Sequence, residues 1–573
     1  MSSAAYAPLS PTQLDNFKNP LRLPGENGIM GMLDASDMPV RITAQKDSVE
    51  IAPGKRTELH AYRAERDGKT YMNPTIRVKK GKEFSAEFAN AIDEETTVHW
   101  HGLYVDWQMD GHPFRPVAPG STYRYAFPVQ NRAGTYWYHP HPHGGTARQI
   151  YSGLAGFFLV DDEDEQRLVE ALDLELGKTD IPLLIQDKVL DEDGNFVYEP
   201  DTMAVAMGYE GDVVLVNLTP TPYLEVSTRI YRLRLLNGSN ARTYRVAFNK
   251  VGEEELLPYH VIGTDGGLLD RPQVVREVFL SPGERVDVLL DLRSFEMGEE
   301  LVLKSLPFDP MHHEHEIGMG GAAEHTGHME RMDHTEHMGH MGHVEHTGHT
   351  EHMGHTKHME MEQHHEAGHH MDHQTRHHMD HHMGHQMGPA RLPDGSAFYL
   401  LKLVVGEKTD YSRRVPEILS EIPKPELGEA DPRPITISMT ADDGGTRWLI
   451  NGKTHTMDEF PIVVQRGAKE VWEIYNHEKS MPHPIHLHGF QFRVLERVGT
   501  PEQVAHLAVD EEGRLATDLG LKDTVLLWPG ETVKCAMDFS HGFDGEQLYM
   551  FHCHILEHEM GMMLNLKVVD ALG

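Results

Sequence analysis

Cysteine is scarce in this chain of 573 residues, which contains only Cys535 and Cys553. That count excludes a fold built on disulfide bridges. Long apolar runs are also absent: the longest, Leu154–Val160, is far shorter than the roughly 20 residues that a membrane-spanning helix needs. We therefore expect no membrane span, and stability that comes from buried apolar cores.

Basic residues are few relative to acidic ones, 52 against 89, and the formal net charge is −37 at pH 7. A surface of this charge repels phosphate groups, so we expect no nucleic-acid partner. The first residues, Met1 to Ala5, open into polar sequence without the apolar stretch of a secretory signal. The sequence leaves open whether the protein is cytoplasmic or has lost a leader.

An internal repeat divides the chain into three β-rich units. A Pro-Gly turn precedes an alternating strand at Pro119, Pro282 and Pro529, and three such copies predict an all-β fold of three Greek-key β-sandwich domains. We predict the domains at 1–165, 166–410 and 411–573. Representative strands are predicted at 122–129, 231–236, 285–292, 462–466 and 532–539, with a helix at 166–176. The second copy ends without histidines, so the middle domain is expected to be structural.

Histidine is unusually frequent, with 42 residues, of which 24 fall in the window 311–388 and 18 elsewhere. Five His-x-His pairs occur outside that window, at 99/101, 139/141, 141/143, 486/488 and 552/554. Residues i and i+2 of a strand point to the same face, so each pair presents two imidazoles to one point. Imidazole binds copper, zinc, iron and nickel, so the pairs alone do not identify the metal.

Cys553 narrows the choice of metal, because it lies between the two histidines of the last pair and points away from both on a strand. With His558, a distant histidine and a weak axial methionine, its thiolate gives the donor set of a blue copper centre. We predict His483 as the distant histidine, since the other two histidines of its segment form a pair of their own. Cys535 is predicted to be a small buried apolar side chain.

The motifs His99-Trp100-His101-Gly102, His139-Pro140-His141, His483-Pro484-Ile485-His486-Leu487-His488 and His552-Cys553-His554 resemble the four copper signatures of the multicopper oxidases. The resemblance covers nearly the whole chain outside the window 311–388. It is closest to bacterial three-domain members, such as copper-efflux cuprous oxidases and laccases. It implies three cupredoxin-like domains, four copper ions, reduction of O2 to water, and a periplasmic or secreted protein, which we expect to be a monomer.

The same resemblance implies a set of ligands. It gives the type 1 copper His483, Cys553, His558 and a methionine; the type 2 copper His99 and His486; and the type 3 pair His101, His139, His141, His488, His552 and His554. The axial methionine is predicted to be Met562, with Met563 as the alternative, because the loop after the cysteine is one residue shorter than the family's usual loop. His143, just past its motif, is expected to lie behind the ligands.

Two carboxylic acids, Asp110 and Glu559, resemble the acids with which family members deliver protons. Reduction of O2 to two waters consumes four protons, and their delivery into a cluster of imidazoles needs buried acids. The alternative interpretation is a turn aspartate before Gly111 and a solvated glutamate.

The window 311–388 also holds 13 of the 30 methionines, and nine of its histidines recur at every third residue from His334 to His358. Thioethers favour Cu(I) and imidazoles bind Cu(II) among other ions, so we predict additional labile copper on a mostly disordered segment. A general store for zinc or nickel and a plain polar spacer are the alternatives. Predicted strands at 301–307 and 398–405 flank the window, which is therefore expected to expand a hairpin of the second domain.

Two functions remain from the sequence: a cuprous oxidase in copper tolerance, and a laccase-like oxidase of phenols or other small aromatics. O2 is the electron acceptor in both. Copper storage is a weaker alternative because storage does not need the Cys553 thiolate. Two-domain copper nitrite reductases are disfavoured by the three repeats.

Overall fold

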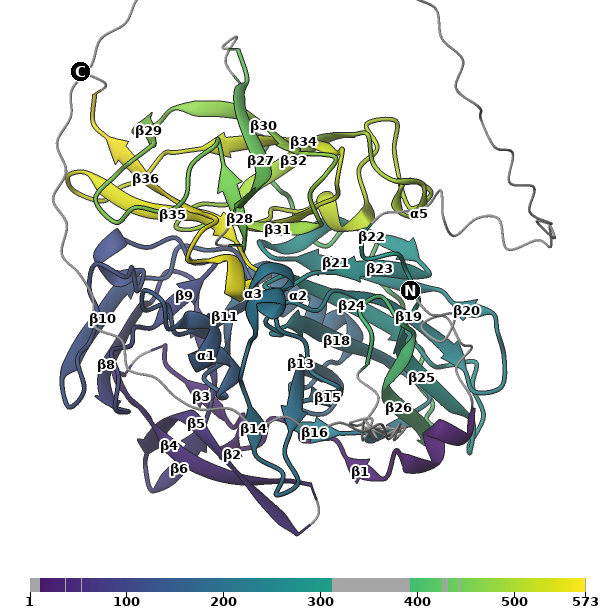
Figure 1. The fold of residues 1–573 in the computed structure, drawn as a ribbon. Coiled ribbons are helices and arrows are strands. Elements are labelled where there is room, and N and C mark those ends of the chain that lie inside the picture. Colours follow the sequence, from purple (N-terminus) through teal and green to yellow (C-terminus); the bar gives the residue numbers. More distant parts are fainter. Residues whose placement is uncertain are drawn as a thin grey trace, which may run out of the picture. The chain divides into compact units, whose positions relative to one another are not determined.

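The computed structural model describes residues 11–36, 38–52, 54–311, 392–424, 427, 431–442 and 445–571. Its strands form six sheets, two in each of three successive parts of the chain apart from the short β1, and these parts follow one another from purple through teal to yellow in Figure 1. The predictions for the histidine-rich and methionine-rich window lie outside the described residues, except at Met311.

The first domain pairs a six-stranded sheet with a five-stranded one. The larger has the order β10 (Thr122–Pro128), β8 (Glu83–Ala91), β4 (Val40–Ala52), β5 (Lys55–Arg66), β6 (Lys69–Met72), β2 (Gly28–Ile29). The smaller has the order β3 (Met32–Asp34), β7 (Thr75–Lys79), β12 (Gly156–Asp161), β11 (Gly134–His139), β9 (His99–His101). Trp100, Tyr138 and Phe158 of the smaller sheet are buried in the core of this domain, which turns their neighbours in β9 and β11 to the other face.

The second domain has a seven-stranded and an eight-stranded sheet. The first runs β1 (Asn19–Pro20), β17 (Pro222–Ser227), β26 (Phe398–Glu407), β25 (Glu300–Ser305), β19 (Tyr244–Lys250), β20 (Leu256–Leu257), with β23 (Glu277–Leu280) on β19. The second runs β16 (Thr219–Pro220), β15 (Val213–Val216), β13 (Asp180–Leu190), β18 (Ile230–Asn237), β24 (Arg285–Asp291), β21 (Tyr259–Thr264), β22 (Gly267–Val275), with β14 (Phe196–Val197) on β13. β25 and β26 pair antiparallel, which confirms the predicted hairpin around the window.

The third domain has two five-stranded sheets. One runs β28 (Gly445–Ile450), β27 (Arg433–Asp442), β30 (Lys469–Asn476), β34 (Thr532–Asp538), β32 (Phe492–Val498). The other runs β29 (Ile462–Gln465), β36 (Met563–Val569), β35 (Gln547–Cys553), β31 (His483–Leu487), β33 (Thr524–Leu527). Trp472, Phe551 and both cysteines are buried in the core between them, so the prediction for Cys535 is confirmed.

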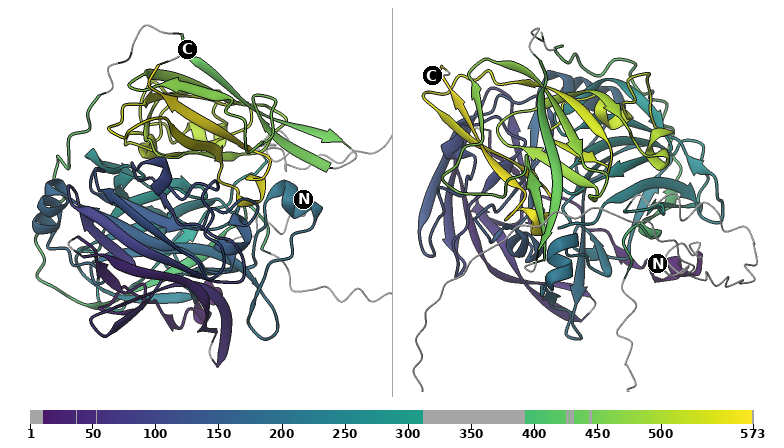
Figure 2. Two further views of the ribbon diagram at one scale, coloured as in Figure 1. Left: turned by 90° about the vertical axis from the view of Figure 1, so that its left-hand side faces the viewer. Right: turned by 45° about the horizontal axis from the view of Figure 1, so that its top comes forward.

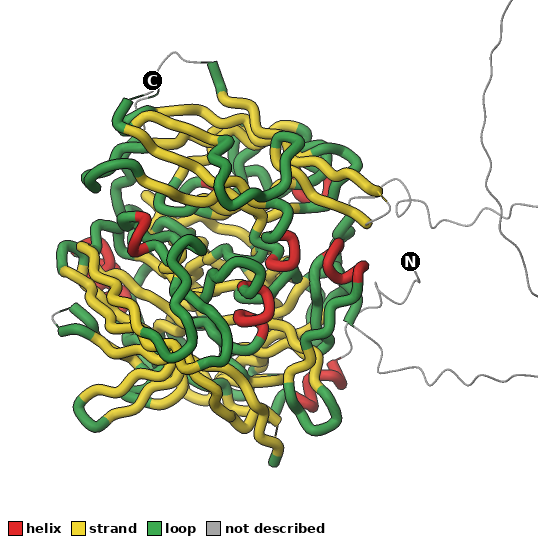
Figure 3. Tube along the Cα trace, turned by 60° about the vertical axis from the view of Figure 1, so that its left-hand side comes forward, coloured by secondary structure: helices red, strands yellow, loops and turns green. Residues whose placement is uncertain are grey.

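Helices are short and lie among the strands, as Figure 3 shows in red. They are α1 (Thr146–Tyr151), α2 (Glu163–Leu172), α3 (Thr202–Met207) and α5 (Glu502–Ala505), with 3-10 turns η1 (Pro11–Asn16), η2 (Trp107–Met109), η3 (Ala516–Asp518) and η4 (Leu556–His558). The helix predicted at 166–176 begins earlier, because Asp162 accepts hydrogen bonds from the backbone of Asp164 and Glu165 and caps α2. No helix in the described ranges is both long enough and apolar enough to cross a membrane.

The chain moves to new sheets between β12 and β13 and again between β26 and β27, which supports the proposed domain boundaries near 165 and 411. One departure concerns β1, which lies within the predicted first domain but pairs parallel with β17 of the second. After β26, Tyr411 and Leu419 pack against the core of the second domain before the chain enters β27, the long green strand seen in both views of Figure 2.

Candidate metal centres

Strand alternation sends the histidine pairs to one place. His99 and His139 lie opposite each other where β9 pairs with β11, and His486 lies opposite His552 where β31 pairs with β35. Side chains directly opposite each other in an antiparallel pair share a face. One sheet of the first domain and one sheet of the third domain thus each place paired histidines on one face. All of the predicted cluster histidines are buried.

Eight histidines form three groups, each with one ring nitrogen per residue and all of these nitrogens within 4.8 Å of one another. The groups are His99, His101 and His486; His101, His139 and His554; and His141, His488 and His552. Every histidine predicted for the type 2 and type 3 coppers is therefore in one of the groups. The geometry, however, places His101 in two of them.

Facing ring nitrogens are very close: His488 Nε2 and His552 Nε2 are 3.0 Å apart, and His99 Nε2 and His486 Nε2 are 3.4 Å apart. The other nitrogen of each of these four rings faces an oxygen at 2.7 to 2.8 Å, which assigns the ring proton to that side. Burial lowers the pKa of His488 and His552 well below the usual value, so the rings are neutral. Lone pairs that face each other at such distances repel, and a cation between them removes the repulsion. The donor set therefore fits bound metal.

The two predicted acids are buried against these rings. Asp110 Oδ2 lies 2.7 Å from His488 Nδ1, and Glu559 Oε1 lies 2.9 Å from His141 Nδ1 and accepts a hydrogen bond from Thr146 Oγ1 at 3.0 Å. Burial alone would lower the pKa of His141, but the Glu559 carboxylate raises it. Since Asp110 is fully buried and Glu559 is 3% exposed, the alternative of a solvated glutamate is wrong.

A separate group joins His483, Cys553 and His558. Cys553 Sγ lies 3.5 Å from His483 Nδ1 and 3.7 Å from His558 Nδ1. The far nitrogens are occupied: His483 Nε2 contacts Ser480 Oγ at 3.0 Å, and His558 Nε2 donates to the Ala206 carbonyl at 2.9 Å. Burial lowers the pKa of His483 well below its usual value and that of His558 to about 3, so both rings are neutral and offer a lone pair toward the sulfur. Two imidazoles and one thiolate are the donors that copper of the blue type requires.

Strand parity distinguishes the two methionines predicted as axial ligands. Met563 lies opposite His552 in the β35–β36 pair and so shares the face of the cluster histidines. Met562 is fully buried in the same apolar core as Cys553, and its backbone carbonyl accepts a hydrogen bond from the Cys553 amide at 3.0 Å. The parity supports Met562, which stays our proposal for the axial position.

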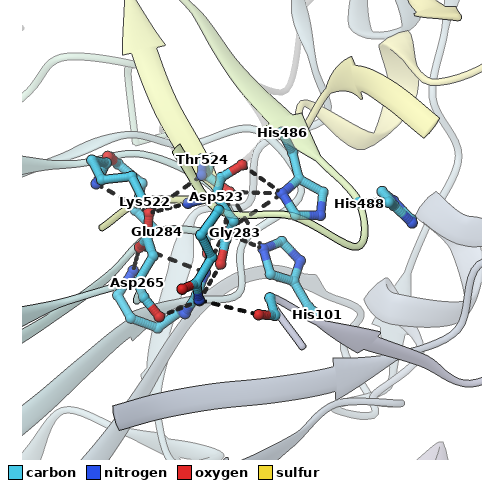
Figure 4. A network of polar contacts seen from close by, with 12 residues as sticks. His101, Asp265, Gly283, Glu284, His486, His488, Lys522, Asp523 and Thr524 are labelled. Atoms are coloured by element: carbon cyan, nitrogen blue, oxygen red, sulfur yellow. Dashed lines mark hydrogen bonds and ion pairs between the residues drawn. The ribbon is translucent and has the colours of Figure 1, made fainter. Parts of the chain in front are cut away.

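A buried carboxylate that the sequence did not reveal, Asp523, lies beside the cluster (Figure 4). Its Oδ1 lies 3.0 Å from His101 Nε2. The other ring nitrogen of His101, Nδ1, therefore faces His139 Nε2 at 3.3 Å. Burial would raise the pKa of Asp523, but the Arg285 guanidinium holds it well below its usual range. Charged residues are rarely buried, and a Lys-Asp-Thr sequence at a strand start gives no signal of such a role.

The second domain also shapes the cluster, although it supplies no histidine to it among the described residues. A Cβ on Gly102 would lie 2.4 Å from Asp523 Oδ2 and 2.7 Å from an Arg285 nitrogen. A Cβ on Gly283, in the Pro-Gly turn of the second domain, would lie 2.9 Å from the His554 ring. The glycines permit these close approaches, so the expectation of a purely structural middle domain is too narrow.

His143 departs from its expected place behind the ligands. It is exposed, and its ring lies beside that of His455, with centroids 5.5 Å apart. The fifth His-x-His pair therefore sends His141 into the cluster and leaves His143 at the surface.

Comparison with known proteins gives consistent results. Two family models described as multicopper oxidase match residues 57–165 and 429–571. The crystal structure of the McoA multicopper oxidase from Aquifex aeolicus is 34% identical, covers 96% of this chain and 99% of its own, and has a TM-score of 0.74.

Two curated proteins are similar over most of the chain. The multicopper oxidase mco of Staphylococcus aureus is 27% identical over 92% of this chain and 88% of its own length. The laccase of Bacillus subtilis is 27% identical over 87% of this chain and 89% of its own length.

Proposed function

This chain belongs to the multicopper oxidase family, and on that premise we propose that it oxidises a small reductant one electron at a time and reduces O2 to two waters with four electrons and four protons. The reductant that we propose is Cu(I). Copper tolerance, in the periplasm or outside the cell, is the proposed setting.

The proposed copper ligands are those predicted from the sequence. His483, Cys553, His558 and Met562 would hold a type 1 ion; His99 and His486 a type 2 ion; and His101, His139, His141, His488, His552 and His554 a type 3 pair. When bound, four copper ions supply the one-electron redox chemistry that collects electrons from a reductant and passes four of them to O2.

The connection between the two centres is short and covalent. Cys553 belongs to the mononuclear group, and its chain neighbours His552 and His554 belong to the cluster. Because side chains alternate along a strand, Cys553 points to one face at the end of this strand, and His552 and His554 point to the other. This arrangement supports transfer of electrons along a few backbone bonds instead of across a gap.

We propose that Asp110 and Glu559 deliver protons to the cluster. Glu559 bridges His141 in the cluster and the Thr146 hydroxyl, while Asp110 contacts His488 on another side. A buried carboxyl group in hydrogen-bond reach of the reacting site can take up a proton and hand it on. The two acids therefore support delivery of protons to the cluster histidines at two different places.

A cavity of about 500 Å³ beside the mononuclear group carries the proposal for Cu(I). Its lining includes four methionines and four acids: Met203, Met207, Met311, Met481, Glu199, Asp201, Glu210 and Asp394. Met481 shares the apolar core of Cys553, against which Met207 and Met311 pack. The Ala206 carbonyl of α3 accepts hydrogen bonds from both His558 and Trp448, so the helix that lines the cavity with Met203, Ala204 and Met207 also contacts a proposed ligand. Thioethers select Cu(I), and the Glu199 and Asp201 carboxylates attract cations, whereas Glu210 pairs with Arg242 at 3.0 Å.

Met311, the first residue of the histidine-rich and methionine-rich window, and Leu392, four residues after its end, both line this cavity. The places of Met311 and Leu392 support our proposal that copper gathered on the window enters the cavity.

A phenol is the second candidate reductant. The cavity is large enough for a small aromatic ring, and part of its lining is apolar, with Val189, Tyr209 and Leu392. The similarity to a Bacillus subtilis laccase favours the same alternative.

The two reductants are separated by substitutions that keep volume and remove sulfur. Met207→Leu with Met481→Leu should lower kcat/KM for Cu(I) about tenfold or more, since the thioether is the donor that selects this ion, and should change phenol oxidation little. Met297→Leu, at a methionine that is 63% exposed in another part of the fold, is the control. O2 uptake with each reductant is the measurement. If both activities fall equally, or phenol is oxidised far faster by every variant, the proposal of a cuprous oxidase fails.

A further inference from the structure

Four soft or nitrogenous donors gather at the surface outside both centres: His143, His455, Met457 and Met560. His143 and Met560 are exposed, and His455 and Met457 are half-buried. They come from three loops that are distant in the sequence. No function described above uses any of them.

Their spacing matches that of the ligand pairs in the same molecule. The His143 and His455 rings have centroids 5.5 Å apart, and the rings of His483 and His558, which share one proposed ion, have centroids 5.3 Å apart. His455 Nε2 lies 3.3 Å from Met457 Sδ, close to the 3.5 Å between His483 Nδ1 and Cys553 Sγ. Two rings and one sulfur thus have the separations of donors to a common ion.

Met560 brings a second sulfur to the same place. A Cβ built on Gly144, the residue after His143, would lie 3.4 Å from Met560 Sδ. The His455 amide donates to the Gly561 carbonyl at 3.1 Å, which ties the His455 loop to the residue after Met560. Met560 therefore lies between the two histidine loops.

The loop that carries Met457 is held by hydrogen bonds from the side chain of a buried residue, Asn565. Asn565, which is 1% exposed, donates through its side chain to the carbonyls of Thr456 and Met457 at 3.1 and 2.8 Å. A third contact reaches the Glu459 carbonyl at 2.9 Å. A buried amide that holds a loop in this way limits the entropy that would be lost when Met457 binds an ion.

We propose that His143, His455, Met457 and Met560 form a surface site for a soft monovalent cation, Cu(I) in the cell. Two imidazoles and two thioethers are the donors that favour Cu(I) over hard cations. The site is distinct from the cavity beside the mononuclear group, with which it shares no residue. It requires neither O2 reduction nor a particular reductant, so it stands or falls independently of the proposed function.

Silver(I) is a suitable probe, because it prefers the same soft donors and adds no redox chemistry of its own. The full protein, with its resident copper, is titrated with Ag(I) and then treated briefly with a thioether-selective oxaziridine, and the tagging of each methionine is read from its peptide by mass spectrometry. Reading individual peptides separates the site from the silver that binds the window 311–388. Met38 is the matched control residue, since it is 53% exposed and Met560 is 50% exposed.

We expect Ag(I) to protect Met560 and Met457 at concentrations that leave Met38 fully reactive. His455→Gln and His143→Gln should each raise the silver concentration needed for protection about tenfold or more. His506→Gln, which removes an exposed histidine directly after α5, should leave the protection unchanged. Protection of Met560 only in parallel with Met38, or protection that persists unchanged in both histidine variants, would overturn the proposal.

Discussion

Arg285 of β24 forms a two-pronged ion pair with Asp523, which directly precedes β33. Nη1 lies 2.8 Å from Oδ1, and Nη2 lies 2.5 Å from Oδ2. Both side chains are fully buried, and Asp523 also receives the ring of His101. The second domain therefore orients a cluster histidine through a carboxylate of the third domain, in the manner of the carboxylates that support metal-bound histidines.

Asp523→Asn should weaken the hold on copper near His101 and His486. The substitution keeps shape but removes the charge that orients the ring, and such losses lower metal affinity or activity about 10- to 100-fold. We expect a diminished or altered type 2 signal in electron paramagnetic resonance after dialysis against a chelator. The blue absorption should persist, because Cys553 and its partners lie in a different group.

The matched control is Glu277→Gln, which breaks a similar two-pronged pair with Arg245 at 2.8 and 2.9 Å. It should leave the copper signals intact. If the control variant loses the type 2 signal to the same extent, Asp523 acts only through the stability of the fold.

The two cysteines should behave in opposite ways. Cys553→Ser should abolish the absorption near about 600 nm, which arises from a copper–thiolate bond, together with all turnover. Cys535→Ser should retain both, since Cys535 lies in the apolar core mid-strand in β34, and the buried hydroxyl costs only about 1–3 kcal/mol of stability. Absorption spectra of the two variants at equal protein concentration are the measurement. A blue Cys553→Ser protein would contradict the ligand assignment.

Much of the fold and of the candidate site could be predicted because it depends on local periodicity. Alternation along a strand is a property of the backbone, so His552 and Cys553 could be sent to opposite faces without any knowledge of tertiary structure. The strand predicted at 285–292 is found as β24, Arg285–Asp291. Pro-Gly turns predicted where such strands begin, because proline presets the backbone angle of one turn position and glycine adopts the positive φ that a turn needs.

The rest depends on contacts between distant segments. Asp523 and Arg285 are 238 residues apart, and neither has a neighbour in the sequence that signals burial. The same is true of α3, whose Ala206 carbonyl accepts a hydrogen bond from His558 across 352 residues. The pairing of β1 with the second domain rests on only two residues, too few for any periodic pattern. Such features follow from domain packing and could not be derived from local sequence.

The choice between Met562 and Met563 can be tested by leucine at each position. Leucine conserves volume, so each variant should lose less than about 1.5 kcal/mol of stability. Met562→Leu should shift the reduction potential and the visible spectrum of the blue centre, because the axial ligand tunes both. Met563→Leu should leave the potential and the spectrum unchanged, since Met563 lies opposite His552, on the face of the strand that points away from Cys553. Redox titration followed by absorbance distinguishes the two, and the reverse result would assign Met563.

Acid should weaken the contact between α2 and the second domain through Glu165. Its Oε1 accepts hydrogen bonds from Arg232 and Arg234 at 2.6 and 2.7 Å, and all three side chains are at most 4% exposed. Burial would raise the pKa of Glu165, but the two arginines lower it to about 2 from 4.5. A folded-state pKa below the unfolded value means that the charge stabilises the fold above pH 4.5 and that this stabilisation is lost as pH falls toward 2.

Glu165→Gln should therefore lower the Tm strongly at pH 7, because removal of one partner from a buried ion pair costs about 3–5 kcal/mol. The gap between wild type and variant should narrow progressively below pH 4.5, since protonation removes the same charge from the wild type. Differential scanning calorimetry at several pH values measures this difference in Tm. Glu163→Gln, at an exposed position in the first turn of the same helix, should show a small and nearly constant difference. A Glu165 gap that stays constant down to pH 3 would mean that packing, and not the charge, provides the stability.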